Sequence, residues 1–539
     1  MPNQTAPSSP SIESSRIRLV AVIDIGATSI RMAIAEIHEN GSVRTLDTLN
    51  QSVNLGKDTF TRSAIRKETI EECVQVLQLY RRKLEEYGIT EKDNIRVVAT
   101  SAVREASNQL AFLDRIYIAT GIEIESIDEA EVNRITYLGV QAFLKSSASR
   151  KNIQTLITEV GGGSTEILLV KKGSVAYSHT YRMGSLRLRR MIEDYRAPMF
   201  KVRSIMENQI QRTIQQILLN LKLSGPVKLI AIGGDIRFAV SQLIPDWDRE
   251  QVVRIPLQSI EEFTDEMLTL SEGEIVRKFH LNFPNVETLG PALLTYVMLA
   301  KALNLDQVTV TNTNLRDGLL QDMAVKDSWS DDFHNQVIRS ALDLGRKYRF
   351  DQTHARHVAE LSRKLFRKLS GKHHLDTHYE VILYVAALLH ETGSFISSHS
   401  MHKHSMYIIQ HSELFGLGKK DLLLVAMVAR YHRRASPQPG HEGYATLNRD
   451  ERVVVAKLAA ILRIGVALDE SRSQRIQDFD CESRSGTLII VIPNVEDLSL
   501  EKLALSQSGS LFEEIFGKKI VLRITGRERS TSELKSLDV

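Results

Sequence analysis

Asp24-Ile25-Gly26-Ala27-Thr28-Ser29 and Glu159-Val160-Gly161-Gly162-Gly163-Ser164 repeat one pattern within the first third of the chain. Each stretch runs from an acidic residue through an apolar residue and a glycine to a serine, with β-prone segments on both sides. This layout predicts a strand, a tight turn that exposes backbone N–H groups to an anion, and a returning strand. Two such turns facing each other would hold a chain of phosphates, and the acidic residue of each would hold a hydrated Mg²⁺ against the phosphate charge.

The composition indicates a large protein with balanced charge. A chain of 539 residues is long enough for three or four domains. Its 69 Lys and Arg residues against 66 Asp and Glu residues give a formal net charge of +3, which does not indicate nucleic-acid binding. The two cysteines, Cys73 and Cys481, are too few for a disulfide framework and suit a reducing cytoplasm.

The remaining segments favour a cytoplasmic location. Residues 1–16 are rich in Ser, Pro, Asn and Gln, which predicts a disordered tail rather than a signal peptide. The longest apolar runs, 381–389 and 422–429, are far too short to span a membrane. We therefore expect no membrane partner and no nucleic-acid partner.

Strand-like and helix-like patterns alternate between residues 17 and 318, which indicates two related α/β halves with a cleft between them. Strands are expected at 17–26, 29–37, 154–159, 165–171, 174–182 and 227–232, and long helices at 61–87 and 198–223. The composition then changes. Residues 329–468 carry 13 of the 16 histidines and no strand pattern, which predicts a helical domain. Residues 487–492 and 520–524 regain β character, so a small α/β unit is expected at the end of the chain.

One helix start is well defined by its sequence. Asp128 can act as the N-cap, and Glu131, three residues later, can complete a capping box. Ile127 and Val132 stand at the two positions of a hydrophobic staple.

A series of motifs along the chain resembles the exopolyphosphatase/guanosine pentaphosphate phosphatase (Ppx/GppA) family, which belongs to the actin–sugar kinase–Hsp70 fold superfamily. The motifs lie at 24–31, 99–106, 159–166, 233–235 and 315–318, and those at 388–393, 401–405 and 430–433 resemble the HD-type helical domain of long family members. The resemblance implies an actin-like lobe I at 17–135, an actin-like lobe II at 136–325, a helical HD-like domain at 326–475 and a small α/β domain at 476–539.

The resemblance implies hydrolysis of a phosphoanhydride with Mg²⁺. The substrate would be inorganic polyphosphate, which loses its terminal phosphate, or guanosine pentaphosphate, which loses its 5′ phosphate. Carried over residue by residue, Asp24, Glu159 and Glu166 hold the metal, Glu166 also has a catalytic part, and Arg31 and Arg104 bind non-bridging oxygens. The residues that would line the phosphate track are Gly26, Thr28, Ser29, Gly161, Gly162, Gly163, Ser164 and Thr165. Phosphoryl transfer depends on charge neutralisation and positioning, which such residues supply.

The chain departs from the family pattern at three places. Glu159 replaces the usual Asp, and Ala27-Thr28 replaces Ser-Asn. Val132 stands where the family has the glutamate that acts as the base. General-base assistance contributes about 10²–10⁴ in rate, and enzymes achieve about 10⁶ or more overall, so this loss predicts a slow hydrolase rather than an inert one. Glu131 is the neighbouring catalytic candidate, and the alternative for Glu131 is the capping box.

The helical domain contains part of an HD metal site. His354 and His390 match the expected histidine ligands, but Glu391 replaces an aspartate and Val466 stands at the final ligand position. Because metal affinity follows ligand number and geometry, we expect a vestigial site. Basic residues that would extend a polyphosphate track, or else form an ordinary solvated helix face, are Arg187, His402, Lys403, His404, Arg430, His432 and Arg433.

Three classes of function follow from these patterns. The first is an exopolyphosphatase-like hydrolase, with a guanosine pentaphosphate phosphatase as the alternative substrate choice. The second is a sensor that binds polyphosphate or guanosine polyphosphates with turnover weakened by Val132. An ATP-dependent kinase of the same fold is disfavoured because no second substrate pocket is indicated. Long family members commonly form homodimers, so a homodimer is what the resemblance implies for this chain.

Overall fold

The chain forms two compact units, Met1–Ser328 and Trp329–Val539. The structure is a computed structural model that describes residues 17–147, 153–194, 199–325, 331–484 and 486–525. No helix in these described ranges is both long enough and apolar enough to cross a bilayer.

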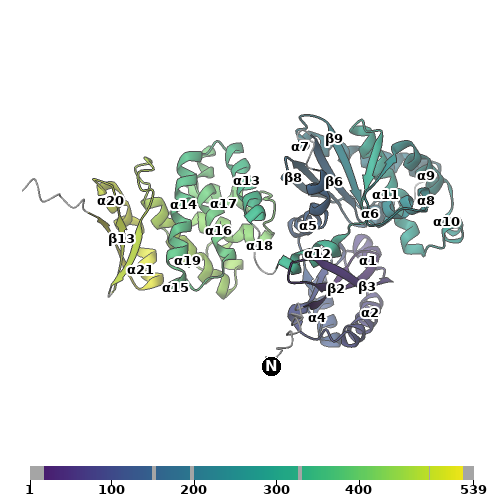
Figure 1. Ribbon diagram of the computed structural model, residues 1–539, viewed down its shortest axis with the longest axis horizontal. Helices are drawn as coiled ribbons and strands as arrows, with labels where there is room; N and C mark the ends of the chain where they lie inside the picture. Colours follow the sequence, from purple (N-terminus) through teal and green to yellow (C-terminus); the bar gives the residue numbers. More distant parts are fainter. Residues whose placement is uncertain (1–16, 148–152, 195–198, 326–330, 485, 526–539) are drawn as a thin grey trace, which may run out of the picture. The chain divides into compact units, whose positions relative to one another are not determined.

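The first unit contains two β-sheets with the same internal order (Figure 1). One sheet has the order β3-β2-β1-β4-β5, and the other has β10-β11-β9-β6-β7-β8. Read as β8-β7-β6-β9-β11, five strands of the second sheet repeat the order of the first, so the predicted pair of related α/β halves is confirmed. The strands are β1 (Arg18–Ile25), β2 (Ser29–Ile37), β3 (Val43–Ser52), β4 (Ile95–Ala99), β5 (Glu125–Ser126), β6 (Gln154–Val160), β7 (Thr165–Lys171), β8 (Ser174–Tyr181), β9 (Val227–Ile232), β10 (Val253–Pro256) and β11 (Gln307–Val310).

Helices cover both sheets of this unit. The sheet of β1–β5 with its helices is lobe I, and the sheet of β6–β11 with its helices is lobe II. The helices are α1 (Leu55–Arg62), α2 (Lys67–Glu86), α3 (Ser101–Arg104), α4 (Gln109–Thr120), α5 (Glu129–Ser147), α6 (Ser185–Asp194), α7 (Met199–Leu221), α8 (Gly234–Leu243), α9 (Leu257–Thr269), α10 (Glu272–Phe279), α11 (Phe283–Ala302) and α12 (Leu315–Val325), with a short 3₁₀ turn η1 (Lys92–Asn94).

The two predicted hairpins have identical turn geometry. In the first, the Gly26 N–H donates to the Ser29 carbonyl at 2.9 Å, and in the second the Gly161 N–H donates to the Ser164 carbonyl at 2.9 Å. The register pairs Asp24 with Arg31 across the first hairpin and Glu159 with Glu166 across the second. The repeated sequence motif is therefore a repeated structure, with an acid–base pair in one copy and two acids in the other.

The predicted single helix at 61–87 is wrong, because the segment contains parts of two helices with a break between them. Ser63 ends α1 in the left-handed region at φ 58°, and α2 begins at Lys67. Asp58 is buried and holds the corner, since its carboxylate accepts from the Arg66 backbone N–H at 3.1 Å and from the Thr69 hydroxyl at 2.6 Å. The apolar periodicity continues across this corner, which explains why it did not reveal the break.

Helix α12 joins the core of lobe I rather than that of lobe II. Leu315, Leu319 and Leu320 pack with Val20 and Val22 of β1 in one apolar cluster. Figure 1 shows α5 and α12 between the two sheets. The predicted boundaries, which placed 136–325 in lobe II, therefore divide this helix pair incorrectly, since α5 continues through residue 135 and α12 covers the first sheet.

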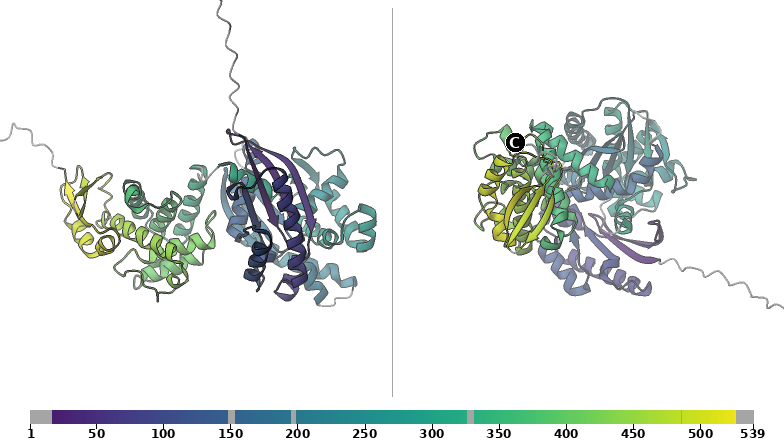
Figure 2. Two further views of the ribbon diagram at one scale, coloured as in Figure 1. Left: turned by 90° about the horizontal axis from the view of Figure 1, so that it is seen from below. Right: turned by 60° about the vertical axis from the view of Figure 1, so that its left-hand side comes forward.

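The second unit is helical up to residue 468, as predicted, and ends in a small sheet. Its sheet has the order β12-β13-β14, and Figure 2 shows these strands side by side in yellow. The helices are α13 (Asp331–Lys347), α14 (Gln352–Lys368), α15 (Ser370–His373), α16 (His378–Leu389), α17 (Met401–Gln410), α18 (Lys419–Arg430), α19 (Arg449–Ala467), α20 (Ser499–Ser508) and α21 (Ser510–Phe516), the 3₁₀ turns are η2 (Thr392–Phe395) and η3 (Tyr444–Thr446), and the strands are β12 (Asp480–Arg484), β13 (Thr487–Ile492) and β14 (Lys519–Ile524).

Replacing Gly318 with alanine should destabilise the first unit. A Cβ at Gly318 in α12 would lie 2.7 Å from Cγ2 and 2.8 Å from the carbonyl carbon of Ile135 in α5, and this backbone cannot move without separating the two helices. We expect Gly318→Ala to lower the free energy of unfolding by about 1–3 kcal/mol in urea titrations followed by circular dichroism. Gly273→Ala is the matched control, because a Cβ there meets open space. Equal stability of the two variants would contradict the close helix crossing.

Candidate active site

The two glycine turns line one cavity of about 540 Å³ in the first unit. The turns are in contact, since a Cβ added to Gly162 would lie 2.9 Å from the Cβ of Ala27. Backbone N–H groups from both lobes can therefore reach a single anion chain. The predicted site residues that line the cavity are Asp24, Gly26, Thr28, Ser29, Arg31, Arg104, Glu159, Gly161, Gly162, Gly163, Ser164 and Glu166.

A half-buried carboxylate, Glu159, and a buried one, Glu166, lie directly opposite each other in the second hairpin. Glu166 is only 5% exposed, and its carboxylate accepts a hydrogen bond from the Ser164 hydroxyl at 2.6 Å. Burial, with a smaller contribution from the neighbouring Glu159 charge, raises the pKa of Glu166 to about 7. Burial also raises the pKa of Glu159. Like charges paired across two strands are unfavourable, so this position favours a proton or a cation.

Arginines bring positive charge to the same cavity. Arg316, at the start of α12, lies 3.4 Å from the Asp24 carboxylate, and Arg31 lies 3.9 Å from it. Arg104 is fixed by a 2.7 Å hydrogen bond to the Ile127 carbonyl, which aligns it beside the start of α5. These guanidinium groups can neutralise a polyanion, whose oxygens match their planar array of donors.

The donor set fits a hydrated Mg²⁺. Asp24, Glu159 and Glu166 are hard oxygen ligands at one cavity, and the buried Ser29 hydroxyl, also in its lining, has no hydrogen-bond partner within the described part of the chain. The three carboxylates are not gathered tightly enough to chelate a bare ion together, since the only such group among the described residues lies in the second unit. Mg²⁺ usually keeps several waters and takes one or two carboxylates, which this arrangement can supply.

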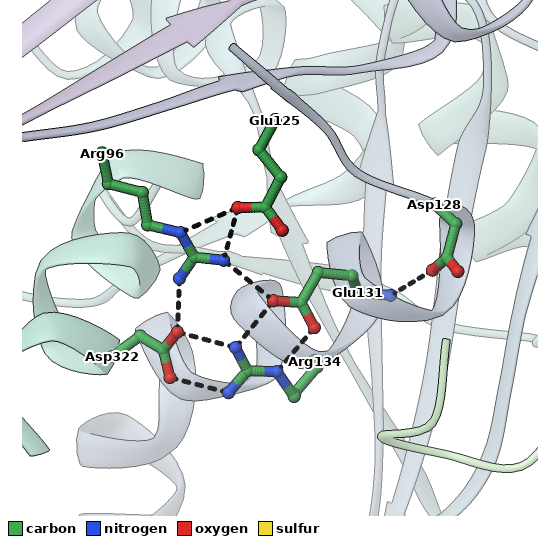
Figure 3. Close-up of polar contacts among 6 residues, drawn as sticks. All are labelled: Arg96, Glu125, Asp128, Glu131, Arg134 and Asp322. Atoms are coloured by element: carbon green, nitrogen blue, oxygen red, sulfur yellow. Dashed lines mark hydrogen bonds and ion pairs between the residues drawn. The ribbon is translucent and has the colours of Figure 1, made fainter. Parts of the chain in front are cut away.

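Glu131 belongs to an ion cluster and not to the cavity, so its predicted catalytic role is corrected (Figure 3). Its carboxylate accepts from Arg134 at 2.7 Å through both oxygens and from Arg96 at 3.1 Å. Asp322 of α12 binds the same two arginines. Burial alone would raise the pKa of Glu131, but these arginines outweigh it and lower the pKa. A carboxylate held ionised in this way is a poor proton acceptor.

The start of α5 follows the predicted local pattern. The Asp128 carboxylate accepts the Glu131 backbone N–H at 2.9 Å, as an N-cap does. Ile127 and Val132 lie in the same apolar cluster, as a hydrophobic staple requires. Val132 is 8% exposed and also contributes to the cavity lining, so an apolar side chain stands at the position where a base was expected.

Thr165 and Arg187 are not among the described residues that line the cavity, and their predicted phosphate contacts are corrected. Thr165 is fully buried, and its hydroxyl donates to the Met183 carbonyl. Arg187 donates to the Gly163 carbonyl at 2.9 Å and to Glu105 at 2.8 Å. Because Gly163 lies in lobe II and Glu105 in lobe I, Arg187 ties the second turn to the opposite lobe.

Two residues of the predicted basic track in the second unit are buried. Arg430 is 9% exposed and donates to the Glu442 carbonyl at 3.2 Å, and His432 is 5% exposed. The prediction that Arg430 and His432 contact a polyphosphate chain at the surface is therefore corrected, since both side chains are buried inside the helical domain. His402 and His404 are partly exposed, while Lys403 and Arg433 are exposed.

The cavity contains functional candidates that sequence reasoning missed. Asp235 lies in the lining, and burial raises its pKa to about 6 despite a hydrogen bond from Thr288. Arg237 lines the cavity as well and donates to the Thr313 carbonyl at 2.8 Å. Arg316 and Asp235 fall within the family motifs at 315–318 and 233–235, so these motifs could have identified both residues as site candidates. A Gly-Gly pair is more often a turn than a binding site, so this pair by itself gives no reason to assign Asp235 a role.

Removing the Glu131 carboxylate should reduce stability. Glu131→Gln removes one of the two carboxylates that Arg96 and Arg134 share, and we expect a loss of about 1–3 kcal/mol in urea unfolding. Glu125→Gln is the matched control in the same cluster, because the Glu125 side chain is 56% exposed and such pairs contribute about 0–1 kcal/mol. Equal losses in the two variants would contradict the structural role of Glu131.

The stability of the first unit should depend on Glu166 as pH changes. A pKa raised from 4.5 to about 7 means that the folded state binds the proton more tightly, so folded wild type loses stability as pH rises through this range. In metal-free buffer we expect Glu166→Gln to gain up to about 3 kcal/mol relative to wild type between about pH 5 and about pH 8. Calorimetry measures this difference, with the exposed Glu250→Gln as control. A stability difference between Glu166→Gln and wild type that stays constant with pH would contradict the raised pKa of Glu166.

Comparisons with known proteins assign both units to one family. Residues 22–327 match the model of the Ppx/GppA phosphatase family, and residues 338–508 match Ppx/GppA phosphatase, domain III. The guanosine-5′-triphosphate,3′-diphosphate pyrophosphatase of Aliivibrio fischeri (strain ATCC 700601 / ES114) is 24% identical over 465 residues, which cover 82% of this chain and 86% of the relative. The protein of the same name from Vibrio cholerae is 25% identical over 468 residues, with 85% and 88% covered.

A solved structure shows the same fold. An exopolyphosphatase from Cytophaga hutchinsonii superposes with a TM-score of 0.51 at 21% identity, and the match covers 57% of this chain and 98% of that one. The family match extends over both glycine turns, the α5–α12 pair and the motif at 315–318. The chain belongs to the Ppx/GppA phosphatase family.

Proposed function

We propose that this protein releases the terminal phosphate of inorganic polyphosphate by hydrolysis, with Mg²⁺. The observation that carries the proposal is the single cavity to which two glycine turns from opposite lobes contribute. A linear phosphate chain presents oxygens on all sides, so it can accept hydrogen bonds from both turns at once. The family to which the chain belongs consists of phosphatases, which supports a hydrolase.

Different residues of the cavity have different roles in phosphoryl transfer. The turns at Gly26 and Gly161–Gly163 orient the phosphate chain through backbone N–H groups, while Arg31, Arg104 and Arg316 neutralise its negative charge. Asp24, Glu159 and Glu166 would hold Mg²⁺, which supplies further charge neutralisation on the phosphate oxygens.

Glu166 is the best candidate for accepting a proton from the attacking water when Asp24 and Glu159 hold the Mg²⁺. A base works best when its pKa is near the working pH, and in the metal-free site burial raises the pKa of Glu166 to about 7. Val132 leaves the family's base position apolar, so turnover depends on Glu166 or proceeds without a base. The expected consequence is a hydrolase slower by about 10²–10⁴ than one with a dedicated base.

Guanosine pentaphosphate is the second candidate substrate. Part of the cavity lining is apolar, with Phe238, Leu281 and Leu289, and such a surface suits a nucleoside better than a bare phosphate chain. The relatives from Aliivibrio and Vibrio carry the name of a guanosine pentaphosphate pyrophosphatase, which supports the same choice.

The proposal also places the protein in a reducing cytoplasm. Both Cys73 and Cys481 are free thiols, which supports a reducing cytoplasm. The match of the second unit to domain III of the family supports the proposal of an HD-like helical domain.

Phosphate release from long-chain polyphosphate and from guanosine pentaphosphate, each with Mg²⁺, tests the function. We expect wild type to turn over at least one substrate and Glu166→Gln to reduce turnover by about 10²–10⁴. Val132→Glu should raise it, because a carboxylate then stands at the family's base position. Glu131→Gln, the matched carboxylate outside the cavity, should keep wild-type turnover per folded molecule.

The outcomes separate the alternatives. A preference of at least tenfold in kcat/KM for one substrate assigns the substrate. Wild type that binds both compounds without turnover, while Val132→Glu hydrolyses them, would identify a sensor and refute the hydrolase. If neither compound binds, the proposed substrate class is wrong.

A further inference from the structure

A buried tyrosine of lobe II bonds to the ends of two neighbouring strands. Tyr296 belongs to α11 and is 1% exposed. Its hydroxyl accepts from the Val160 backbone N–H at 2.8 Å and donates to the Ile232 carbonyl. Val160 is the last residue of β6 and Ile232 is the last residue of β9. Because β6 and β9 run parallel, the hydroxyl ties the carboxyl ends of both strands together.

The two strands separate directly beyond this tie. β6 enters the glycine turn at Gly161, whereas β9 enters α8 through Gly233, whose φ of 123° favours glycine. A Cβ added to Gly233 would lie 3.1 Å from the hydroxyl oxygen of Tyr296 and 3.7 Å from Cγ of Glu159. The hydroxyl and the Glu159 side chain therefore pack against the same glycine.

Two acids of the cavity are attached to these strand ends. Glu159 precedes Val160 and pairs with Ile232 in the register of the two strands. Asp235 follows Ile232 by three residues and lies in the first turn of α8. Both acids line the cavity, whereas Tyr296 is not among the described residues that line it. Tyr296 thus holds the backbone that carries the acids and stands behind them.

The hydroxyl of Tyr296 keeps its proton at neutral pH. Burial, with smaller contributions from the charges of Glu159 and Asp235, raises the pKa of Tyr296 well above its ordinary value. The same helix also fixes Asp235 directly, because the buried Thr288 hydroxyl donates to Oδ1 of Asp235 at 3.0 Å. Thr288 lies about two helical turns before Tyr296, so one rigid element sets the position of both acids.

We propose that Tyr296 is a positioning residue of the cavity, and that its hydroxyl places Glu159 where the carboxylate can take up a divalent cation. This role rests on the proposed function, in which Glu159 is one of the Mg²⁺ ligands. Removing a group that orients a metal ligand commonly weakens metal binding about 10–100-fold. Tyr296 therefore acts on the affinity for the metal and not on the phosphate chain itself.

Binding of Mn²⁺ to the full chain, followed by electron paramagnetic resonance, tests the proposal. Mn²⁺ shares the preference of Mg²⁺ for oxygen ligands. Metals are first removed with a chelator, and the Mn²⁺ ion that Glu159→Gln fails to bind reports on the cavity. We expect Tyr296→Phe, which keeps the ring in the core of lobe II and removes only the hydroxyl, to bind this ion about 10–100-fold more weakly.

Tyr384→Phe is the matched control. The Tyr384 side chain is also buried, and its hydroxyl donates to Glu360 at 2.8 Å in the second unit. This variant likewise loses one hydroxyl hydrogen bond, so it should bind the cavity Mn²⁺ as wild type does.

The Mg²⁺ dependence of turnover separates positioning from a purely structural role. In Tyr296→Phe the half-saturating Mg²⁺ concentration should rise by the same factor as the Mn²⁺ dissociation constant, while kcat at saturating Mg²⁺ stays at the wild-type value per folded molecule. A lower kcat with an unchanged Mg²⁺ dependence would make Tyr296 a structural residue only and would overturn the proposal.

The outcomes also separate this proposal from the proposed function. If Tyr296→Phe, folded by circular dichroism, binds the cavity Mn²⁺ as wild type does, the positioning role is wrong and the proposed function is unaffected. If wild type shows no Glu159-dependent Mn²⁺ binding and hydrolyses neither polyphosphate nor guanosine pentaphosphate, the proposed function fails and the role of Tyr296 fails with it.

Discussion

The contact between two glycine turns is the constraint on which the first unit depends. Gly162 can approach Ala27 only because it has no side chain, and this approach brings backbone donors of both lobes to one cavity. Arg187 reinforces the contact by joining Gly163 to Glu105. Helices α5 and α12 complete the connection between the lobes, with Gly318 allowing their close crossing. Anion binding and lobe packing are therefore consequences of the same small residues.

The cavity combines buried or half-buried acids with half-buried arginines, and this balance decides its chemistry. Burial raises the pKa values of Glu159, Glu166 and Asp235, which marks them as groups that would gain from a cation or a proton. Outside the cavity, Glu131 has a lowered pKa because Arg96 and Arg134 bind it. Two neighbouring residues of α5 therefore have different roles. Glu131 belongs to an ion cluster that stabilises the fold, and Val132 gives the cavity an apolar surface.

Local patterns predicted most of this unit, and the errors came from long-range contacts. The hairpin turns at Gly26 and Gly161 and the N-cap at Asp128 depend on a few adjacent residues, so the sequence was sufficient to predict them. The partners of Glu131 are Arg96 in β4 and Asp322 in α12, and no local pattern could reveal them. The packing of α12 on β1 was missed for the same reason, whereas the corner at Asp58 was missed because the apolar periodicity continues across it.

The second unit shows how a sequence comparison by aligned position can miss a chemical equivalent. Val466 occupies the aligned position of a carboxylate, yet Asp469, one turn later at the end of α19, reaches His354. The difference arises because a side chain's position depends on how a helix ends, while an alignment records only residue order. Both side chains are buried, so the contact between His354 and Asp469 belongs to the interior of the helical domain.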